Sequence, residues 1–313
     1  MRTLVTGGSG YLGRPVIDAL LAAGHQVTVV SRRDVSCRPG VRSLRGDVRD
    51  RDRMHEVIAD GRFDAVCHFA AAVKGRDSFA DPLTYFDVNV AGTLNLLQAL
   101  RDVGSPARFV FASTDKVYGS SRSGAVDETV PPAPESPYAE SKASAEQLIA
   151  AQARTGAIGA VTLRCFNLAG TAGGVPDDDP DRIIPNAFRA ATGARSHVTL
   201  NGDGSAVRDF VHVLDVTDAV LLALAAARPG RSHTYNIGSG VATSMAEIVA
   251  TVEAVTGRGV PVVRAPAQPE PQALIADVTL AREQLGWRPG RSDLTAMLRE
   301  AWQSWPRHDG GPG

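Results

Sequence analysis

The sequence is poor in cysteine and holds no long apolar run. The three cysteines among 313 residues, Cys37, Cys67 and Cys165, are odd in number and widely separated. Such spacing fits neither a disulfide framework nor a metal site, so we predict no bound metal. No apolar run reaches the roughly 20 residues needed to cross a membrane. Met1 leads directly into a strand pattern, so we expect no signal peptide and a cytoplasmic protein.

Neither sign of charge is in excess. The chain carries 33 basic and 34 acidic residues, for a net charge of −1. This balance, with no cluster of basic residues, argues against nucleic acid or a membrane surface as a partner. The length and the 43% hydrophobic content suffice for one large domain or two modest ones with a substantial core.

Lysine is the rarest charged residue, because only Lys74, Lys116 and Lys142 appear among the 33 basic residues. Where arginine is so strongly preferred, a lysine persists at positions that arginine cannot serve. The compact ammonium group and adjustable pKa of lysine are properties that arginine lacks. We therefore treat all three lysines as candidate functional residues.

The most informative stretch lies near the start of the chain. A β-branched run from Thr3 ends in glycines at Gly7, Gly10 and Gly13, and an apolar helical pattern follows over Leu12–Leu21. Gly7 permits a tight turn, Gly10 lets the backbone approach a pyrophosphate, and Gly13 lets the helix pack closely on the strand. The helix N-terminus favours phosphate charge. The pattern predicts a dinucleotide-binding turn.

Strand and helix patterns alternate through the first half of the chain, which is typical of a doubly wound parallel sheet in an α/β fold. The predicted strands are Gln26–Ser31, Val41–Arg45, Ala65–Phe69, Phe109–Ser113 and Val161–Cys165, and the predicted helices are a segment capped by Asp50 that ends at Ile58, Pro82–Leu100 and Tyr138–Ala153.

The residue composition of the sequence changes after about residue 166. Glycine, proline and aspartate become frequent over Gly170–Pro185, and a proline-rich linker spans Pro261–Pro271. We predict a Rossmann-type dinucleotide-binding domain over residues 1–166. Residues 167–313 form mainly a smaller α+β substrate-binding lobe, and some of its segments return to the sheet.

The end of the second predicted strand bears on the choice of cofactor. Dinucleotide enzymes that use NAD usually place a carboxylate there, whereas basic residues suit the 2′-phosphate of NADP. This chain has Ser31 and Arg32 followed by Arg33, which favours NADP. Asp47 and Val48, after the third strand, are expected to contact the adenine edge.

Candidate catalytic residues lie on a helix and at a strand end. Tyr138 and Lys142 stand four residues apart and therefore share one helix face. A nearby ammonium group would pull the pKa of the tyrosine down from about 10, so that it acts as a general base or acid. Ser113 and Thr114 end a buried strand, at the edge where doubly wound folds bind their ligands.

At this point the chain resembles the extended short-chain dehydrogenase/reductase family of nucleotide-sugar epimerases and dehydratases, and within it most closely the UDP-glucose 4-epimerases. The resemblance covers nearly the full length. The matching motifs are Thr6–Gly13, Gly46-Asp47-Val48, His68-Phe69-Ala70-Ala71, Asn89-Val90-Ala91-Gly92-Thr93, Val117-Tyr118-Gly119, Ser136-Pro137-Tyr138, Arg164-Cys165-Phe166-Asn167, Val207–Val213 and Leu285–Pro289.

The resemblance implies a role for each matching residue. The NAD or NADP cofactor would be held by Gly7, Gly10, Tyr11, Leu12, Gly13, Ser31, Arg32, Asp47, Val48, Phe69, Ala70, Ala71, Lys74, Asn89, Tyr138 and Lys142. The nucleotide-diphosphate sugar would be held by Lys74, Ser113, Thr114, Tyr138, Asn167 and Arg208. A homodimer would form through the helices Pro82–Leu100 and Tyr138–Ala153.

Three departures from the epimerase pattern stand out. The epimerases carry aspartate at the position of Ser31, and an arginine near the diphosphate aligns with Ala267, so that Arg264 would have to replace it. Thr114, Asp115 and Lys116 are closer to the 4,6-dehydratases, in which the aspartate acts as an acid on the leaving 6-hydroxyl. We count Asp115 and Lys116 as catalytic candidates with Thr114, Tyr138 and Lys142.

The favoured function is a nucleotide-sugar 4-epimerase that works through a transient 4-keto sugar and reversible hydride transfer. A nucleotide-sugar 4,6-dehydratase is the first alternative, and an NADPH-linked sugar ketoreductase is the second. A non-catalytic dinucleotide sensor is a third possibility, and the intact Thr114, Tyr138 and Lys142 argue against it.

Overall fold

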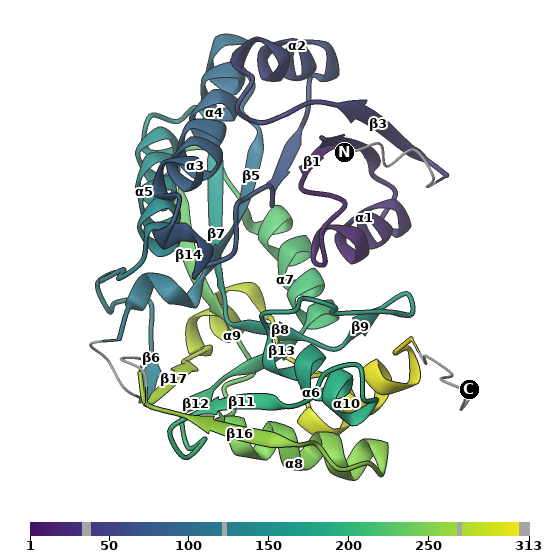
Figure 1. Ribbon diagram of the computed structural model, residues 1–313. Coiled ribbons are helices and arrows are strands. Elements are labelled where there is room, and N and C mark those ends of the chain that lie inside the picture. Colours follow the sequence, from purple (N-terminus) through teal and green to yellow (C-terminus); the bar gives the residue numbers. More distant parts are fainter. Residues whose placement is uncertain (33–38, 121–123, 268–270, 307–313) are drawn as a thin grey trace.

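A computed structural model describes residues 1–32, 39–120, 124–267 and 271–306 (Figure 1). Arg33, Cys37 and the part 268–270 of the predicted proline-rich linker lie outside these described residues. Within the described ranges, no helix is long and apolar enough to cross a membrane.

The centre of the molecule is a parallel sheet of seven strands in the order β14-β7-β5-β4-β1-β2-β3. The strands are β1 (Arg2–Thr6), β2 (Gln26–Ser31), β3 (Val41–Arg45), β4 (Ala65–His68), β5 (Arg108–Thr114), β7 (Gly159–Cys165) and β14 (Ser232–Ile237). The order reverses between β1 and β4, and such a switch point opens a crevice at the carboxyl ends of the strands. The predicted doubly wound α/β fold is confirmed.

Helices cover both faces of the sheet (Figure 1). One face carries α1 (Gly13–Ala22), α7 (Val213–Ala226) and α9 (Thr279–Leu285), and the other carries α2 (Arg51–Gly61), α4 (Gly92–Asp102) and α5 (Pro137–Arg154). Side chains alternate along a strand, so neighbouring residues of β1 enter different cores. Val5 packs in the first core and Leu4 in the second.

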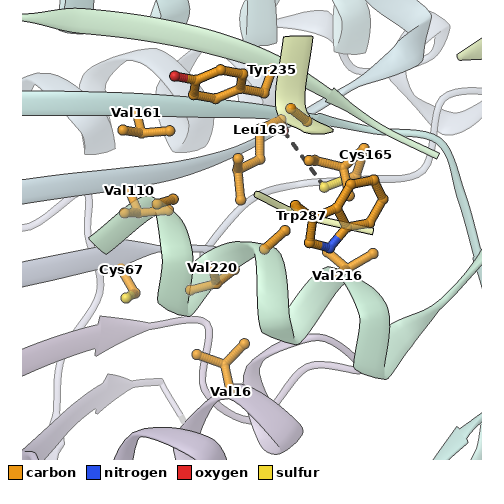
Figure 2. Close-up of a cluster of buried hydrophobic side chains, with 14 of the residues drawn as sticks. Val16, Cys67, Val110, Val161, Leu163, Cys165, Val216, Val220, Tyr235 and Trp287 are labelled. Carbon is orange, nitrogen blue, oxygen red and sulfur yellow. Dashed lines mark hydrogen bonds between the residues drawn. The ribbon is translucent and has the colours of Figure 1, made fainter. Parts of the chain in front are cut away.

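The core beneath α1 and α7 joins distant parts of the chain (Figure 2). Val16 of α1 and Val216 and Val220 of α7 meet the sheet residues Cys67 and Val110 there. Trp287, buried beside them, donates from its indole nitrogen to the Asp215 carbonyl at 2.7 Å. Packing in this core holds the C-terminal part of the chain against the seven-stranded sheet.

Local capping explains where two helices begin. The Asp50 carboxylate accepts from the Arg53 amide at 3.0 Å at the start of α2, which confirms the predicted cap. Ser136 caps α5 in the same way. The predicted helix Pro82–Leu100 is divided into α3 (Pro82–Phe86), a π-helical turn η2 (Asp87–Ala91) and α4.

The smaller lobe lies against the carboxyl edge of the sheet. Its elements are β6 (Gly124–Val126), β8 (Asn167–Ala169), β9 (Thr171–Ala172), β10 (Val175–Pro176), α6 (Ile183–Ala191), β11 (Val198–Asn201), β12 (Val207–Arg208), β13 (Phe210–His212), β15 (Thr243–Ser244), α8 (Met245–Thr256), β16 (Val262–Ala265), β17 (Ala273–Ala276) and α10 (Leu294–Gln303). Its separate core includes Phe188, Ile248 and Leu298. The domain division at residue 166 stays a prediction.

Candidate active site

A cavity of about 1160 Å³ opens at the carboxyl ends of β1, β4 and β5 and extends into the smaller lobe. This volume exceeds the roughly 300–1,000 Å³ typical of a pocket for one small ligand. Its lining contains all but one of the predicted site residues. They are Gly7, Gly10, Tyr11, Leu12, Gly13, Ser31, Arg32, Asp47, Val48, Phe69, Ala70, Ala71, Lys74, Ser113, Thr114, Asp115, Lys116, Tyr138, Lys142, Asn167 and Arg208.

The glycine turn after β1 has the geometry that a dinucleotide requires. Gly7 has φ +73°, and a Cβ there would lie 2.5 Å from the Ala70 amide nitrogen. A Cβ on Gly13 would collide with the Gly7 carbonyl oxygen. The following helix α1 begins without a side-chain cap and with no acidic residue in its first turn. A helix N-terminus of this kind attracts a phosphate, so the residues present fit a bound dinucleotide.

The residues at the end of β2 lie at the rim of the cavity. Arg32 is exposed and lines it, and Ser31 is half-buried. The Arg49 guanidinium holds Asp47 at 2.8 Å. Hydrogen bonds from Arg49 lower the pKa of the Asp47 carboxyl, and the positive charge of Arg32 contributes to this. Arg32 is thus close enough to this carboxylate to share its electrostatic environment.

Asn89 is the predicted site residue that lies outside the cavity lining. Its side chain is buried in the π-helical turn η2, where it accepts from the Ala72 amide at 2.8 Å and donates to the Ala72 carbonyl at 3.0 Å. It also donates to Ser141 Oγ at 2.9 Å. Asn89 therefore holds the loop after β4 against α5, and its predicted contact with the cofactor stays a prediction.

Lys74 reaches across the cavity to the smaller lobe. Its ammonium group pairs with the Asp181 carboxylate at 3.2 Å, and both side chains are about half exposed. The hydrogen bond that Lys74 donates to Asp181 raises the pKa of Lys74. The ion pair links the loop after β4 to the segment before α6, so this lysine lies at a junction between the two lobes.

The candidate catalytic pair forms where the end of β5 meets α5. Tyr138 is half-buried and lines the cavity together with Thr114. Its ring and that of Tyr85 pack edge to face, with ring centroids 6.3 Å apart. Burial raises the pKa of Tyr138 to about 12, and the nearby Thr114 side chain opposes that effect. A tyrosine so placed can exchange a proton with a hydroxyl in the cavity.

Lys142 lies one turn further along α5. Its ammonium group stands 3.9 Å from the centre of the Phe111 ring, a cation–π contact. Burial lowers the pKa of Lys142 to about 7, and the Glu146 carboxylate opposes that effect. The pKa of Tyr138 is not lowered as expected from Lys142, because burial of the phenol outweighs the effects of Thr114 and Arg182 that lower it, and Lys142 is not among the groups that shift it.

Asp115 and Lys116 follow directly in a short turn, η3 (Asp115–Tyr118), since β5 ends at Thr114 and not at Ser113. Thr114 Oγ1 donates to Asp115 Oδ1 at 3.1 Å, and Lys116 Nζ donates to Asp115 Oδ2 at 3.2 Å. The Asp115 side chain is buried, and that of Lys116 is half exposed. The backbone turn lets both Thr114 and Asp115 line the cavity.

Behind the candidate catalytic residues lies a buried ionic network that was not predicted from the sequence. The Glu146 carboxylate of α5 accepts from Ser113 Oγ at 2.5 Å and from Arg164 Nη2 at 2.7 Å. Arg164 also donates to the Tyr118 hydroxyl at 3.0 Å, which donates in turn to Asn236 at 2.7 Å. Glu146 stands four residues after Lys142, the same helical spacing that identified Tyr138 and Lys142.

The smaller lobe contributes the other wall of the cavity. Asn167 Nδ2 donates to the Asp209 carbonyl at 3.0 Å, and Arg208 Nη1 donates to the Pro271 carbonyl at 2.8 Å. Arg182 and Arg195, which were not predicted from the sequence, also line the cavity. Arg264, the suggested replacement for the missing arginine at Ala267, is not among the lining residues of the described chain.

The fold and the site together define a class of enzyme. A doubly wound sheet presents a phosphate-binding glycine turn next to a threonine, a tyrosine and a lysine, the combination used to move a proton and a hydride at a carbinol. A second wall supplies basic and amide side chains. This is a dinucleotide-dependent enzyme with a second binding region for a polar substrate.

Comparisons with known proteins agree with that class. Residues 3–238 match the model of the NAD dependent epimerase/dehydratase family. The UDP-glucose 4-epimerase of Streptomyces lividans is 39% identical over 98% of this chain and 97% of its own length. The chain belongs to the NAD dependent epimerase/dehydratase family.

Solved structures extend the similarity to the whole fold. The Stenotrophomonas maltophila UDP-glucose 4-epimerase, solved with NAD and formylated UDP-arabinopyranose, is 35% identical with a TM-score of 0.90 and 97% coverage of both chains. The Thermotoga maritima UDP-glucose 4-epimerase, solved with UDP-glucose, is 29% identical with a TM-score of 0.88, covering 97% of this chain and 98% of that one.

Proposed function

We propose that this protein is an NAD-dependent nucleotide-sugar 4-epimerase that interconverts a UDP-hexose and its 4-epimer. The observation that carries the proposal is the placement of Thr114 and Tyr138 in one cavity, between the glycine turn and the wall formed by Asn167 and Arg208. Similarity over the full length to UDP-glucose 4-epimerases supports it.

The glycine turn, the loop after β4 and the end of β2 would hold the cofactor. The turn leaves no room for a Cβ on Gly7 or Gly13. The NAD in the related solved structures supports NAD over NADP despite Ser31 and Arg32. When bound in its oxidised form, NAD supplies a reversible hydride acceptor and a positive charge.

Tyr138 is the proposed general base and acid. Its phenolate would take the proton of the sugar 4-hydroxyl during oxidation and return it after the 4-keto sugar has rotated to present its opposite face. A pKa of about 12 is too high for a base at neutral pH, so a positive charge near the phenol is needed to lower it. Thr114 donates or accepts at the same substrate oxygen, and Lys142 lies one turn away to bind ribose.

The smaller lobe would bind the nucleotide diphosphate. Arg208 is nearly buried, and its planar guanidinium suits bidentate binding of phosphate oxygens. Arg195 also lines the cavity and would supply the phosphate contact that we expected from Arg264. Asn167 contributes an amide that can pair with a phosphate or with the sugar.

A homodimer through α3, α4 and α5 is part of the proposal. Leu83 of α3 is 79% exposed, and Phe79 is 65% exposed just before it. Leu94 of α4 is also exposed. Apolar side chains that remain this open beside the catalytic helix would be covered by a second copy of the chain.

The test uses the NAD-loaded protein with UDP-galactose or UDP-glucose, and measures the 4-epimer formed. Replacing Tyr138 by phenylalanine is expected to reduce kcat by about 10²–10⁴-fold while the NAD content is unchanged. The matched control is Tyr235→Phe, because that hydroxyl contacts Gln284 outside the cavity. It should retain the wild-type rate.

Two results would contradict the proposal. Near-normal epimerisation by Tyr138→Phe would remove this residue from the chemistry. A product that has lost its C6 oxygen, with solvent deuterium at C5 after reaction in D₂O, would identify a 4,6-dehydratase in place of an epimerase.

A further inference from the structure

The Asp115–Lys116 ion pair has no part in the proposed epimerisation, yet it lies beside the proposed base. Tyr138 and Thr114 line the same cavity, and hydrogen bonds connect Thr114 to Asp115 at 3.1 Å and Asp115 to Lys116 at 3.2 Å. This series begins beside the phenol and ends at an ammonium group that is 45% exposed. The carboxylate between them is almost fully buried.

A buried carboxylate beside a phenol opposes the loss of the phenol's proton, because two negative charges would then share a poorly solvated space. The charge of Asp115 raises the pKa of Tyr138, although less than burial does. The other charged or titratable groups near the phenol are Arg182 at the start of α6, which lowers that pKa, and Cys165 of β7, which raises it. Tyr85 of α3 packs against the Tyr138 ring, and Lys142 lies one turn along α5.

We propose that Lys116 is a positioning residue for Tyr138: its ammonium group holds and neutralises the Asp115 carboxylate, so that Tyr138 can give up its proton beside it. This inference rests on the proposed role of Tyr138 as the base. It assigns Lys116 an indirect action, through Asp115, with no contact to the reacting atoms.

The structure offers a reason for a lysine at this position. The ammonium group has to reach back to the carboxylate of the preceding residue within a single tight turn, η3, and a compact point charge does so without the planar fork of arginine. A half-exposed ion pair of this kind contributes little to folding stability. The main effect of the ion pair is therefore to neutralise the negative charge next to Tyr138.

The experiment compares Lys116→Met, Asp115→Asn and the double variant, each in the NAD-loaded protein. One readout is the ionisation of Tyr138, taken from the ultraviolet absorbance of tyrosinate after subtraction of the same titration in Tyr138→Phe. The other is the acid limb of the pH profile of kcat/KM for the epimerisation. Asparagine retains an oxygen that accepts from Thr114, so the hydrogen bond next to Tyr138 is preserved.

The single variants should move the titration in opposite directions. Lys116→Met leaves the carboxylate unpaired, so the Tyr138 midpoint and the acid limb should rise by about one pH unit. Asp115→Asn removes the negative charge, so both should fall by about one unit. On the acid limb these shifts correspond to about a tenfold loss and a tenfold gain in kcat/KM at a fixed pH. In the Asp115→Asn background, Lys116→Met should add little.

A role confined to folding predicts lower rates without opposite shifts, and that outcome would overturn the proposal. An equal effect of Lys116→Met with and without Asp115 would overturn it too, because Lys116 would then act directly. The absorbance titration needs no substrate. Opposite shifts in a protein without epimerase activity would therefore support this inference and contradict the proposed function. Titrations that do not shift in an active epimerase would contradict this inference and leave the proposed function in place.

Discussion

Replacing Glu146 by glutamine should strongly destabilise the protein, because the change leaves Arg164 as a buried charge without its counter-ion. The two side chains are 9% and 7% exposed, and the guanidinium meets the carboxylate through Nη2 at 2.7 Å and through Nε at 3.2 Å to both oxygens. Breaking a buried pair by removing one partner typically costs about 3–5 kcal/mol. The remaining hydrogen bond from Arg164 to Tyr118 places the expected loss near the lower end.

This loss can be measured as a shift in the urea midpoint. With a loss of about 3 kcal/mol and an m-value of about 3 kcal/mol/M, at the upper end of the range for small proteins, the midpoint should fall by about 1 M. The matched control is Glu140→Gln on the same helix, where the carboxylate is exposed and its contribution near the helix N-terminus is at most about 1 kcal/mol.

A second variant tests the physical reason behind the first. Replacing both Glu146 and Arg164 by leucine removes the unpaired charge, so the double variant should be more stable than Glu146→Gln. A midpoint for Glu146→Gln within about 0.3 M of the Glu140→Gln control would refute the reasoning, since that shift corresponds to only about 1 kcal/mol. It would mean that Arg164 finds another way to be solvated.

Three further predictions concern the cofactor and the dimer. Gly13→Ala should weaken NAD binding at least about tenfold, because its Cβ collides with the Gly7 carbonyl in the turn that receives the pyrophosphate; calorimetry measures the affinity. Arg32→Ala should weaken NADP binding by about 1.5–3 kcal/mol and leave NAD binding unchanged, since a 2′-phosphate is the group that this guanidinium would meet. Leu83→Glu should convert the proposed dimer into monomers, which light scattering detects.

Each of these has a control in the chain. Gly259→Ala adds a Cβ in open space at an ordinary backbone angle and should leave NAD binding intact. Equal effects of Arg32→Ala on both cofactors would show that this residue does not discriminate them. Val262→Glu, an exposed apolar position on β16, should leave the oligomeric state unchanged, and a monomeric wild-type protein would contradict the proposed dimer.

The sequence by itself determined the doubly wound sheet, the glycine turn after β1 and the shared helix face of Tyr138 and Lys142. Each of those features follows from residues that lie a few positions apart in the sequence. Gly7, Gly10 and Gly13 mark a turn because a Cβ is excluded there, and Tyr138 and Lys142 share a face because four residues make about one helical turn. Strand ends could also be assigned to one edge, because parallel strands carry their carboxyl ends together.

The tertiary structure decided how those residues are surrounded. Asn89 holds the loop after β4 instead of lining the cavity, because its partners Ala72 and Ser141 lie 17 and 52 residues away in the chain. Burial raises the pKa of Tyr138 and lowers that of Lys142, contrary to the expectation from their spacing. Desolvation is the combined effect of every element packed around a group, and no local pattern in the sequence records it.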